Sequence, residues 1–300
     1  MKKKIIDEIK TIMNHNEKND LSYNVQEIGL ENNLSLIFID GGNNEIFSTP
    51  KIKLNIVKIS TIFFNNGIRN KILNYECYLL IQNNKINLFE NKKNNYSWVM
   101  SENKERNVEI FRRLNELNLA KELSQKFKNS YIIIDGTLKQ QFKESDNEKS
   151  ILNLIYKKHY NILSISKSNK ENIDLIYNLI NNSNLKNKTW KTNIINNENF
   201  NSLYAKLHSK SKYIFKIDFN SNLNQININK ILNNLVHNSS DPIFQGYPYG
   251  LILADKFAKV SNNEINLNKT IFKTKINSEN FEKEENFLNI HDKLDSINLP

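Results

Sequence analysis

The sequence predicts an α/β fold in which helices flank a mixed β-sheet. Short apolar runs rich in Ile, Leu and Phe recur along the chain, and they alternate with stretches whose apolar residues have helical spacing. Two of these runs, 34–39 and 131–134, end in the dipeptide Asp-Gly. With 300 residues, 39% hydrophobic and 25% charged, the chain can bury a sizeable core and is globular rather than disordered.

The first part of the chain predicts a helix followed by an antiparallel meander. Residues 1–18 carry Ile at helical spacing. The next strand ends at Asp40, alternation of apolar and polar residues predicts a further strand at 52–64, and another strand-like run covers 71–82. The sequence Asn65-Asn66-Gly67 between them is typical of a hairpin turn.

The remainder of the chain alternates helices and strands. Helices are expected at 104–128, 147–159, 171–182 and 226–237. Strands are expected at 131–135, 161–167, 202–208 and 212–219. A polar, Asn-rich loop is expected over 183–200, and a second loop, 241–249, leads into a helix that carries Asp255.

Three antiparallel strands followed by helix, strand, helix, strand and helix is the order of a ribonuclease H-like fold. The prediction is therefore a ribonuclease H-like mixed sheet flanked by helices, with N- and C-terminal helical additions. Acidic residues fall where that fold carries them: Asp40 at the end of the first strand, Glu116 on the first long helix and Asp135 at the end of the fourth strand.

Each Asp-Gly taken alone is ordinary turn chemistry, in which Asp caps its own turn and Gly supplies a positive φ. Two such dipeptides on two buried strands favour paired carboxylates at Asp40 and Asp135. Glu116 shares a helical face with apolar residues, where a carboxylate is costly to bury unless it is paired or metal-bound. Pairing of Glu116 with Arg112 or Arg113 is the alternative, and Glu109, one heptad earlier, is the rival carboxylate.

Clustered carboxylates suit hard divalent cations such as Mn²⁺ and Mg²⁺, and two such ions can promote phosphodiester cleavage. Other chemistries fit less well, because the sequence has no HExxH, no Walker-type loop and no Gly-x-Ser-x-Gly elbow. The single cysteine, Cys77, excludes an intrachain disulfide and is expected in the core.

The net charge of +10 suits a polyanionic partner, although a generally basic surface is an equally good explanation. No apolar stretch resembles a signal peptide or approaches the length of a membrane span. We therefore expect a soluble, cytoplasmic protein without a membrane partner.

Five stretches together resemble the NurA family of DNA-end-processing nucleases. They are Phe38-Ile39-Asp40-Gly41-Gly42, Arg113-Leu114-Asn115-Glu116, Ile134-Asp135-Gly136-Thr137-Leu138, Ile165-Ser166-Lys167, and Asp241-Pro242-Ile243-Phe244-Gln245-Gly246-Tyr247-Pro248-Tyr249 with Ala254-Asp255-Lys256. The resemblance implies one nuclease domain over 1–300, with an N-terminal helical region at 1–30, the core at 31–282 and a polar tail at 283–300.

The resemblance also implies a homodimer with single-strand endonuclease and 5′-to-3′ exonuclease activity on DNA, acting in double-strand break end resection with a HerA-type hexameric ATPase. The implied cofactor is Mn²⁺, with Mg²⁺ as the alternative, and two ions are expected. By matched position, the metal ligands are Asp40, Glu116, Asp135 and, least securely, Asp255.

Two further residues are assigned to catalysis. We expect Tyr247 to position the scissile phosphate or a neighbouring base, with a loop-anchoring role as the alternative. We expect Lys167 to contact a phosphate oxygen, with a solvated strand-end lysine as the alternative. A DNA path is expected along basic residues: Arg112, Arg113, Lys206, Lys210, Lys212, Lys256 and Lys259.

Two other functions remain open from the sequence. A phosphotransferase or phosphatase is one, but its loops require an Asp at the position of Ile133 and a Thr at the position of Asn43. A non-catalytic DNA-binding subunit is the other, and the filled acidic positions argue against it.

Overall fold

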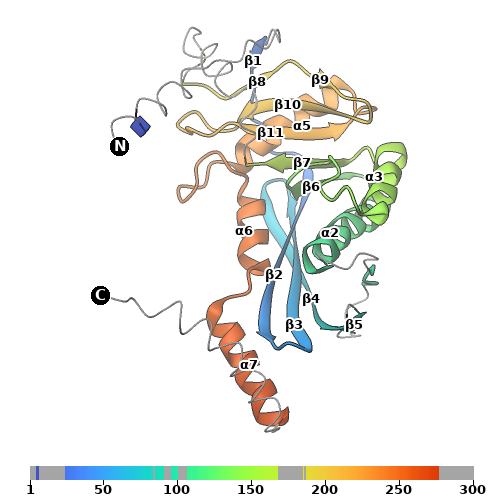
Figure 1. Ribbon diagram of the computed structural model, residues 1–300. Coiled ribbons are helices and arrows are strands. Elements are labelled where there is room, and N and C mark those ends of the chain that lie inside the picture. Colours follow the sequence, from blue (N-terminus) through green and yellow to red (C-terminus); the bar gives the residue numbers. More distant parts are fainter. Residues whose placement is uncertain are drawn as a thin grey trace.

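The computed structural model describes residues 5–6, 24–83, 85–90, 96–100, 107–167, 185 and 187–276. Within these ranges an eleven-stranded mixed sheet runs through the molecule in the order β1-β8-β10-β11-β7-β6-β2-β3-β4-β5, with β9 paired to β10 (Figure 1). The strands are β1 Val25–Glu27, β2 Ser35–Ser48, β3 Ile52–Asn65, β4 Ile68–Gln82, β5 Lys85–Glu90, β6 Ser130–Asp135, β7 Ile162–Ser166, β8 Trp190–Thr192, β9 Ile195–Asn196, β10 Phe200–Lys206 and β11 Phe215–Asn220. The helices considered below are α2 Asn107–Lys126, α3 Asp146–Lys158, α5 Gln225–Asn238, α6 Tyr249–Ala258 and α7 Asn262–Ile276.

The expected antiparallel meander is present as β2, β3 and β4. Asn66 and Gly67 both have positive φ, 49° and 73°, at the turn between β3 and β4. A hairpin turn of this kind matches the right-handed twist of the two strands, which is why Asn-Gly favours it. A further strand, β5, extends the meander by pairing with β4 and was not expected from the sequence.

The second half of the sheet begins with parallel pairing. β6 pairs parallel to β2, β7 pairs parallel to β6, and β11 then pairs antiparallel to β7. Three antiparallel strands followed by two parallel ones confirm the predicted ribonuclease H-like mixed sheet.

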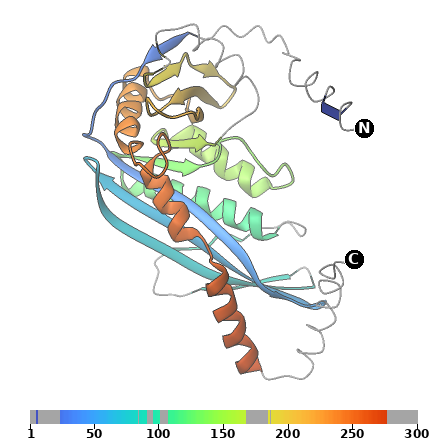
Figure 2. The same cartoon turned by 90° about the vertical axis from the view of Figure 1, so that its left-hand side faces the viewer.

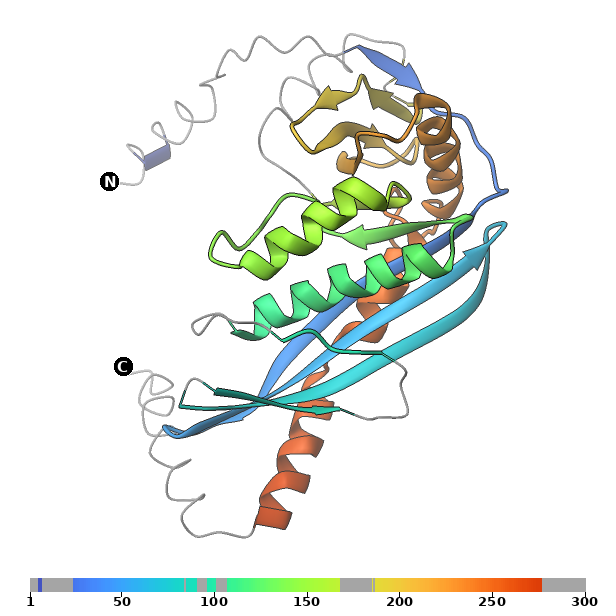
Figure 3. The same cartoon turned by 90° about the vertical axis from the view of Figure 1, so that its right-hand side faces the viewer.

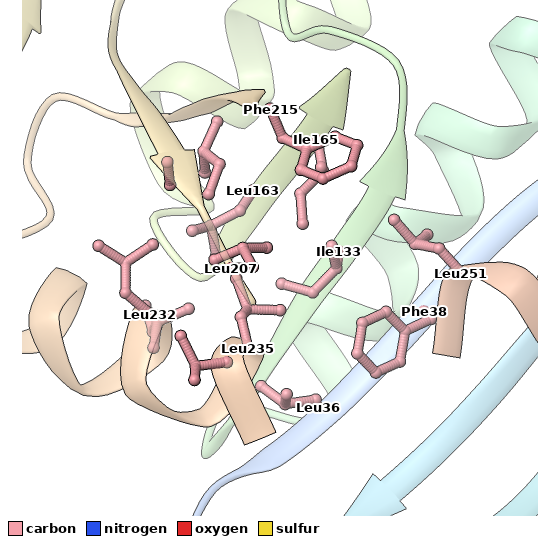
Figure 4. Packing of buried hydrophobic residues seen from close by; sticks show 14 of the residues in the cluster. Leu36, Phe38, Ile133, Leu163, Ile165, Leu207, Phe215, Leu232, Leu235 and Leu251 are labelled. Carbon is pink, nitrogen blue, oxygen red and sulfur yellow. The ribbon is translucent and has the colours of Figure 1, made fainter. Parts of the chain in front are cut away.

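Helices cover both faces of the sheet. α5 and α6 lie on one face (Figure 2), and α2 and α3 lie on the other (Figure 3). Because successive side chains of a strand point to opposite faces, β2 contributes Phe38 to the first core and Ile39 to the second. Figure 4 shows the first core, in which Phe38 and Ile133 of the sheet lie beside Leu251 of α6.

Three expectations from the sequence were wrong. The strand predicted to end at Asp40 continues to Ser48. The predicted loop over 183–200 contains β8 and β9, and the side chain of Trp190 is fully buried. Helix α7 was missed, because none of its residues is buried and its apolar pattern is weak.

Several other expectations lie outside the described residues. They are the helix over 1–18 apart from 5–6, the helix over 171–182 and the tail over 283–300. Cys77, by contrast, is fully buried as predicted. Of the helices that the structure describes, none is both long enough and apolar enough to cross a membrane.

Candidate active site

Asp40 and Asp135 lie side by side on neighbouring parallel strands. Ile39 of β2 is opposite Ile134 of β6, so the two aspartates are the next residues in the register. β6 ends at Asp135, and Gly136 then turns the chain with φ of +104°. The sequence prediction that the two Asp-Gly strands present adjacent carboxylates agrees with this geometry.

The β2 glycines allow two helices to approach the strand from opposite faces. A Cβ on Gly41 would overlap the Glu116 carboxylate of α2, and a Cβ on Gly42 would overlap the Ala258 carbonyl of α6. Gly41 and Gly42 therefore serve close packing rather than a turn, which is why the strand does not end at Asp40.

Glu116 brings a third carboxylate from α2. Its side chain is only 6% exposed; it forms an ion pair with Arg112, and Arg113 Nη1 lies 3.9 Å from its Oε2. Burial raises the pKa of Glu116, Arg112 and Arg113 oppose that shift, and the nearby Asp135 adds to it. Glu116 thus both pairs with Arg112 and lies near the carboxylates of the sheet, whereas Glu109 is exposed.

Four carboxylates share one electrostatic environment centred on Asp40. Burial, together with the charges of Glu116, Asp135 and Asp255, raises the pKa of Asp40 to about 8. The backbone N–H of Gly41, which donates to Oδ1 at 2.8 Å, opposes this shift. Asp255 lies on the exposed side of α6. Like charges gathered around a buried carboxyl disfavour its ionised form, so a cation bound beside these carboxylates would stabilise their ionised forms.

The donor set suits Mn²⁺ or Mg²⁺, because all four groups are hard carboxylate oxygens. As the side chains stand, no three acidic, histidine or cysteine groups within the described ranges form a ready metal-binding cluster. In this arrangement Asp135 is paired with Lys167, whose Nζ donates to Oδ2 at 2.7 Å.

Lys167 and Tyr247 complete the group around Asp135. Burial lowers the pKa of Lys167, but its hydrogen bond to Asp135 and the charges of Asp135, Asp40 and Asp255 raise it overall, so the amine is a cation at neutral pH. Its Nζ also lies 4.9 Å from the centre of the Tyr247 ring.

The Tyr247 hydroxyl is a buried polar group without a hydrogen bond of good geometry to the described residues. Burial raises the pKa of Tyr247, and Asp135, Asp40 and Asp255 raise it further, so the hydroxyl keeps its proton. A buried hydroxyl beside carboxylates normally has a partner, and a ligand oxygen would supply one. Tyr247 is also packed against Phe215, at 5.3 Å between ring centres, which agrees with the anchoring role left open by the sequence.

Comparison with known proteins places the chain in a family. A family model described as the NurA domain matches residues 34–260. The chain belongs to the NurA family.

Solved structures share its fold. The NurA nuclease from Sulfolobus solfataricus is 16% identical, with a TM-score of 0.59 over 92% of this chain and 94% of that one. A second NurA structure is 11% identical, with a TM-score of 0.55 over 93% and 96% of the two chains. A NurA structure bound to dAMP and manganese is 11% identical, with a TM-score of 0.51 over 87% and 92%. No curated protein sequence is significantly similar to this chain.

In this NurA-family chain, a buried ion pair fixes the turn after Asp135. Arg113 is 2% exposed, its Nε donates to Glu148 Oε1 at 3.3 Å, and its guanidinium also donates to the Thr137 carbonyl. Glu148 in turn accepts the backbone N–H of Phe142 at 2.8 Å. Arg113 is therefore unavailable to DNA, contrary to the sequence expectation.

Asp218 of β11 holds the same turn from the other side. Its Oδ2 accepts the Thr137 hydroxyl at 2.6 Å and the Leu138 N–H at 3.2 Å. Sequence reasoning missed both anchors of this turn. A carboxylate inside the apolar run of β11 was a usable signal for Asp218, and the Ser145-x-x-Glu148 pattern of a helix N-terminus was one for Glu148.

The remaining basic residues divide into two groups. Lys206, like Arg113, is buried, and Arg112 is half-buried against Glu116, so these three do not form an open DNA path. The other four are exposed: Lys210, Lys212, Lys256 and Lys259.

A polar cleft of about 930 Å³ adjoins the Asp135 turn at Gly136 and Thr137. Amide and ammonium groups dominate its other walls: Gln140, Gln141, Asn153, Asn196, Asn197, Asn199, Lys139, Lys149 and Lys216. Such a lining can accept a charged, hydrogen-bonding ligand next to the carboxylates.

Proposed function

We propose that the chain is a divalent-metal-dependent DNA nuclease. The observation that carries the proposal is the influence of three neighbouring carboxylates on Asp40: burial and the charges of Glu116, Asp135 and Asp255 raise its pKa to about 8. NurA family membership and the manganese-bound NurA structure support the same reaction class.

In this proposal Asp40, Glu116, Asp135 and Asp255 hold Mn²⁺, with Mg²⁺ as the alternative and two ions as the expected number. When bound, the metal would activate water and stabilise the leaving oxygen of a phosphodiester. Arg112 fixes the Glu116 carboxylate through their ion pair. The Arg113–Glu148 pair and Asp218 keep the Asp135 turn in place.

Lys167 and Tyr247 act on the substrate phosphate in this scheme. Lys167 supplies a positive charge for a phosphate oxygen, where charge develops in the transition state. The protonated Tyr247 hydroxyl lies beside Asp135 and makes no well-formed hydrogen bond within the described residues, so it can donate to a phosphate oxygen. Both groups lie beside Asp135, so they address the same phosphate.

Family membership extends the proposal to biological context. We infer single-strand endonuclease and 5′-to-3′ exonuclease activity, a homodimer, and cooperation with a HerA-type ATPase in double-strand break end resection. We also infer that the nuclease domain spans the chain, with 1–30 and 283–300 as its terminal additions.

Cleavage of labelled DNA tests the proposal directly. Purified protein with Mn²⁺ is expected to degrade a single-stranded oligonucleotide, and EDTA or Asp135→Asn is expected to abolish degradation. Labels at the 5′ and 3′ ends distinguish the direction of digestion. Unchanged cleavage by both Asp40→Asn and Asp135→Asn would refute the proposal, as would hydrolysis of ATP or a small phosphate ester without any cleavage of DNA.

A further inference from the structure

A row of aromatic rings leads from the molecular surface to the carboxylates. The rings of Tyr213 and Phe244 are stacked, with centres 5.2 Å apart and planes 14° apart. Phe244 meets Tyr247 edge-on at 5.9 Å. Lys167 Nζ lies 4.9 Å from the Tyr247 ring centre and 2.7 Å from Asp135 Oδ2. Each member of the row therefore contacts the next, and the row ends at the proposed reaction centre.

The outer end of this row is open to solvent. Tyr213 is 56% exposed, Phe244 36% and Ile243 87%. We name these three residues the aromatic ledge. Isolated apolar residues on a surface need no explanation, but a contiguous group beside a functional site marks a binding surface.

The aromatic ledge is built on two loops that are locked together. The loops 207–214 and 239–248 project from the same side of the molecule and lie side by side (Figure 1). Gly246 has φ of +100°, and a Cβ there would overlap the Ser211 side chain, so the loops meet without a gap. Ser211 Oγ also accepts the Tyr213 N–H at 3.0 Å. Preorganisation of this kind lowers the entropy cost of binding a ligand on the ledge.

The charges around the ledge favour an anionic ligand. Lys210 and Lys212 are exposed in the same loop as Tyr213. The nearest acid in the sequence of the other loop, Asp241, accepts the Ile243 N–H at 2.9 Å and so serves the turn. A ligand that offers flat apolar groups and negative charge together is single-stranded nucleic acid, whose bases stack on aromatic rings while lysines follow its phosphates.

We propose that the aromatic ledge stacks unpaired bases of the DNA strand that enters the active site. This inference rests on the proposed nuclease function, because it names the ledge as the place where that substrate is held. Stacking recognises every base, so the ledge selects single-stranded over paired DNA without selecting sequence.

Binding without cleavage tests this proposal. Fluorescence anisotropy in EDTA compares a labelled fifteen-nucleotide thymidine oligomer with an abasic oligomer of the same length. The native protein is expected to bind the base-bearing strand about 5- to 100-fold more tightly than the abasic strand. Tyr213→Ala is expected to lose most of this preference and to keep its affinity for the abasic strand, and Tyr213→Trp is expected to retain the preference.

Phe89→Ala is the matched control, because Phe89 is 54% exposed on β5, an edge strand separated from β11 by five strands of the sheet. It should behave like the native protein. The proposal is overturned if Tyr213→Ala keeps the full preference, or if the native protein does not distinguish the two strands. It is also overturned if Tyr213→Ala changes only the sedimentation coefficient, since the ledge would then be a protein contact. Cleavage with Mn²⁺ is measured separately, so failure of the nuclease proposal can be distinguished from failure of this one.

Discussion

The two Asp-Gly dipeptides of this chain are alike in sequence and different in structure. Asp40-Gly41 lies within a fourteen-residue strand that continues to Ser48. Asp135 is the last residue of a six-residue strand. Of the glycines that follow the two aspartates, Gly41 and Gly136, it is Gly136 that has positive φ. Gly41 is required because α2 packs directly on it, whereas Gly136 is required because the chain turns there. The same dipeptide therefore allows close helix packing in β2 and a backbone turn at the end of β6.

The two aspartates are also held differently. Asp40 is buried among carboxylates, and its Oδ1 accepts the backbone N–H of its own neighbour, Gly41. Asp135 is half-buried, its carboxylate is bound by Lys167, and its turn is anchored by Arg113 and Asp218. Burial and neighbouring negative charges thus disfavour ionisation of Asp40, whereas a hydrogen-bond network positions Asp135.

The largest expected effect concerns the anchor of the Asp135 turn. Arg113→Met leaves Glu148 buried without its ion-pair partner. Loss of one partner of a buried pair should lower the free energy of unfolding by about 3–5 kcal/mol, measured by urea denaturation. The exposed Arg69 of β4 provides the control, and Arg69→Met should change stability by less than about 0.5 kcal/mol. Equal stability of the two variants would show that the turn does not depend on Arg113.

Removal of either carboxylate charge should have the next largest effect, and it should fall on activity. Asp40→Asn and Asp135→Asn are each expected to reduce the rate of DNA cleavage by about 10²–10³-fold or more, a loss comparable to removal of one transition-state stabilising group. Steady-state cleavage with Mn²⁺ measures this loss, and circular dichroism confirms the fold. A variant of either aspartate that cuts at the native rate would remove that aspartate from the site.

Alanine at the two glycines should separate their roles. A Cβ on Gly41 displaces Glu116, so Gly41→Ala should weaken Mn²⁺ binding by about 10–100-fold, as measured by calorimetry. At Gly136 there is room for a Cβ, but φ is +104°, so Gly136→Ala should cost about 1–2 kcal/mol of stability from backbone strain. If Gly41→Ala lost only stability, or Gly136→Ala lost only metal affinity, the two explanations would have to be exchanged.

The smallest expected effect is a dependence of metal-free stability on pH. Burial and the neighbouring carboxylates together raise the pKa of Asp40 from its ordinary value of 3.8 to about 8, so the folded protein binds the extra proton between these values. Stability from this group is complete below pH 4, falls as the pH rises towards 8, and stays lost above it. Asp40→Asn should therefore raise the free energy of unfolding at pH 9 in EDTA by about 1–2 kcal/mol relative to the native protein.

The same substitution should leave stability at pH 4 almost unchanged, since Asp40 is protonated there in the folded protein. Asp135→Asn is the comparison: it relieves repulsion on Asp40 but removes the ion pair with Lys167, so its gain of stability at pH 9 should be smaller than that of Asp40→Asn. A gain of stability from Asp40→Asn that was equal at both pH values would show that charge burial is not its cause.

Local patterns in the sequence were sufficient for much of the fold. Alternation located β3, a strand-like run located β4, Asn66-Gly67 located their hairpin, and the two apolar runs located the strands that carry the aspartates. These features depend on neighbours in the sequence, so they can be read from it.

Features that depend on contacts between residues far apart in the chain could not be predicted from the sequence. The Arg113–Glu148 pair joins residues 35 apart, and Trp190 is buried in a strand of three residues within an Asn-rich stretch. The end of the first strand was misplaced for the same reason. Gly41 and Gly42 indicate a turn when read locally, and only the presence of α2 and α6 shows that they are packing positions.

The early end of β6 has a consequence for how the carboxylates meet. In a continuous sheet the backbone separates side chains on one face from those on the other. Beyond Asp135, β2 continues to Ser48 without β6 beside it, so the sheet is interrupted on that side of β2. Glu116 comes from the α2 face and Asp255 from the α6 face, yet both influence Asp40. The early end of β6 thus leaves Asp40 within reach of carboxylates from both helical layers.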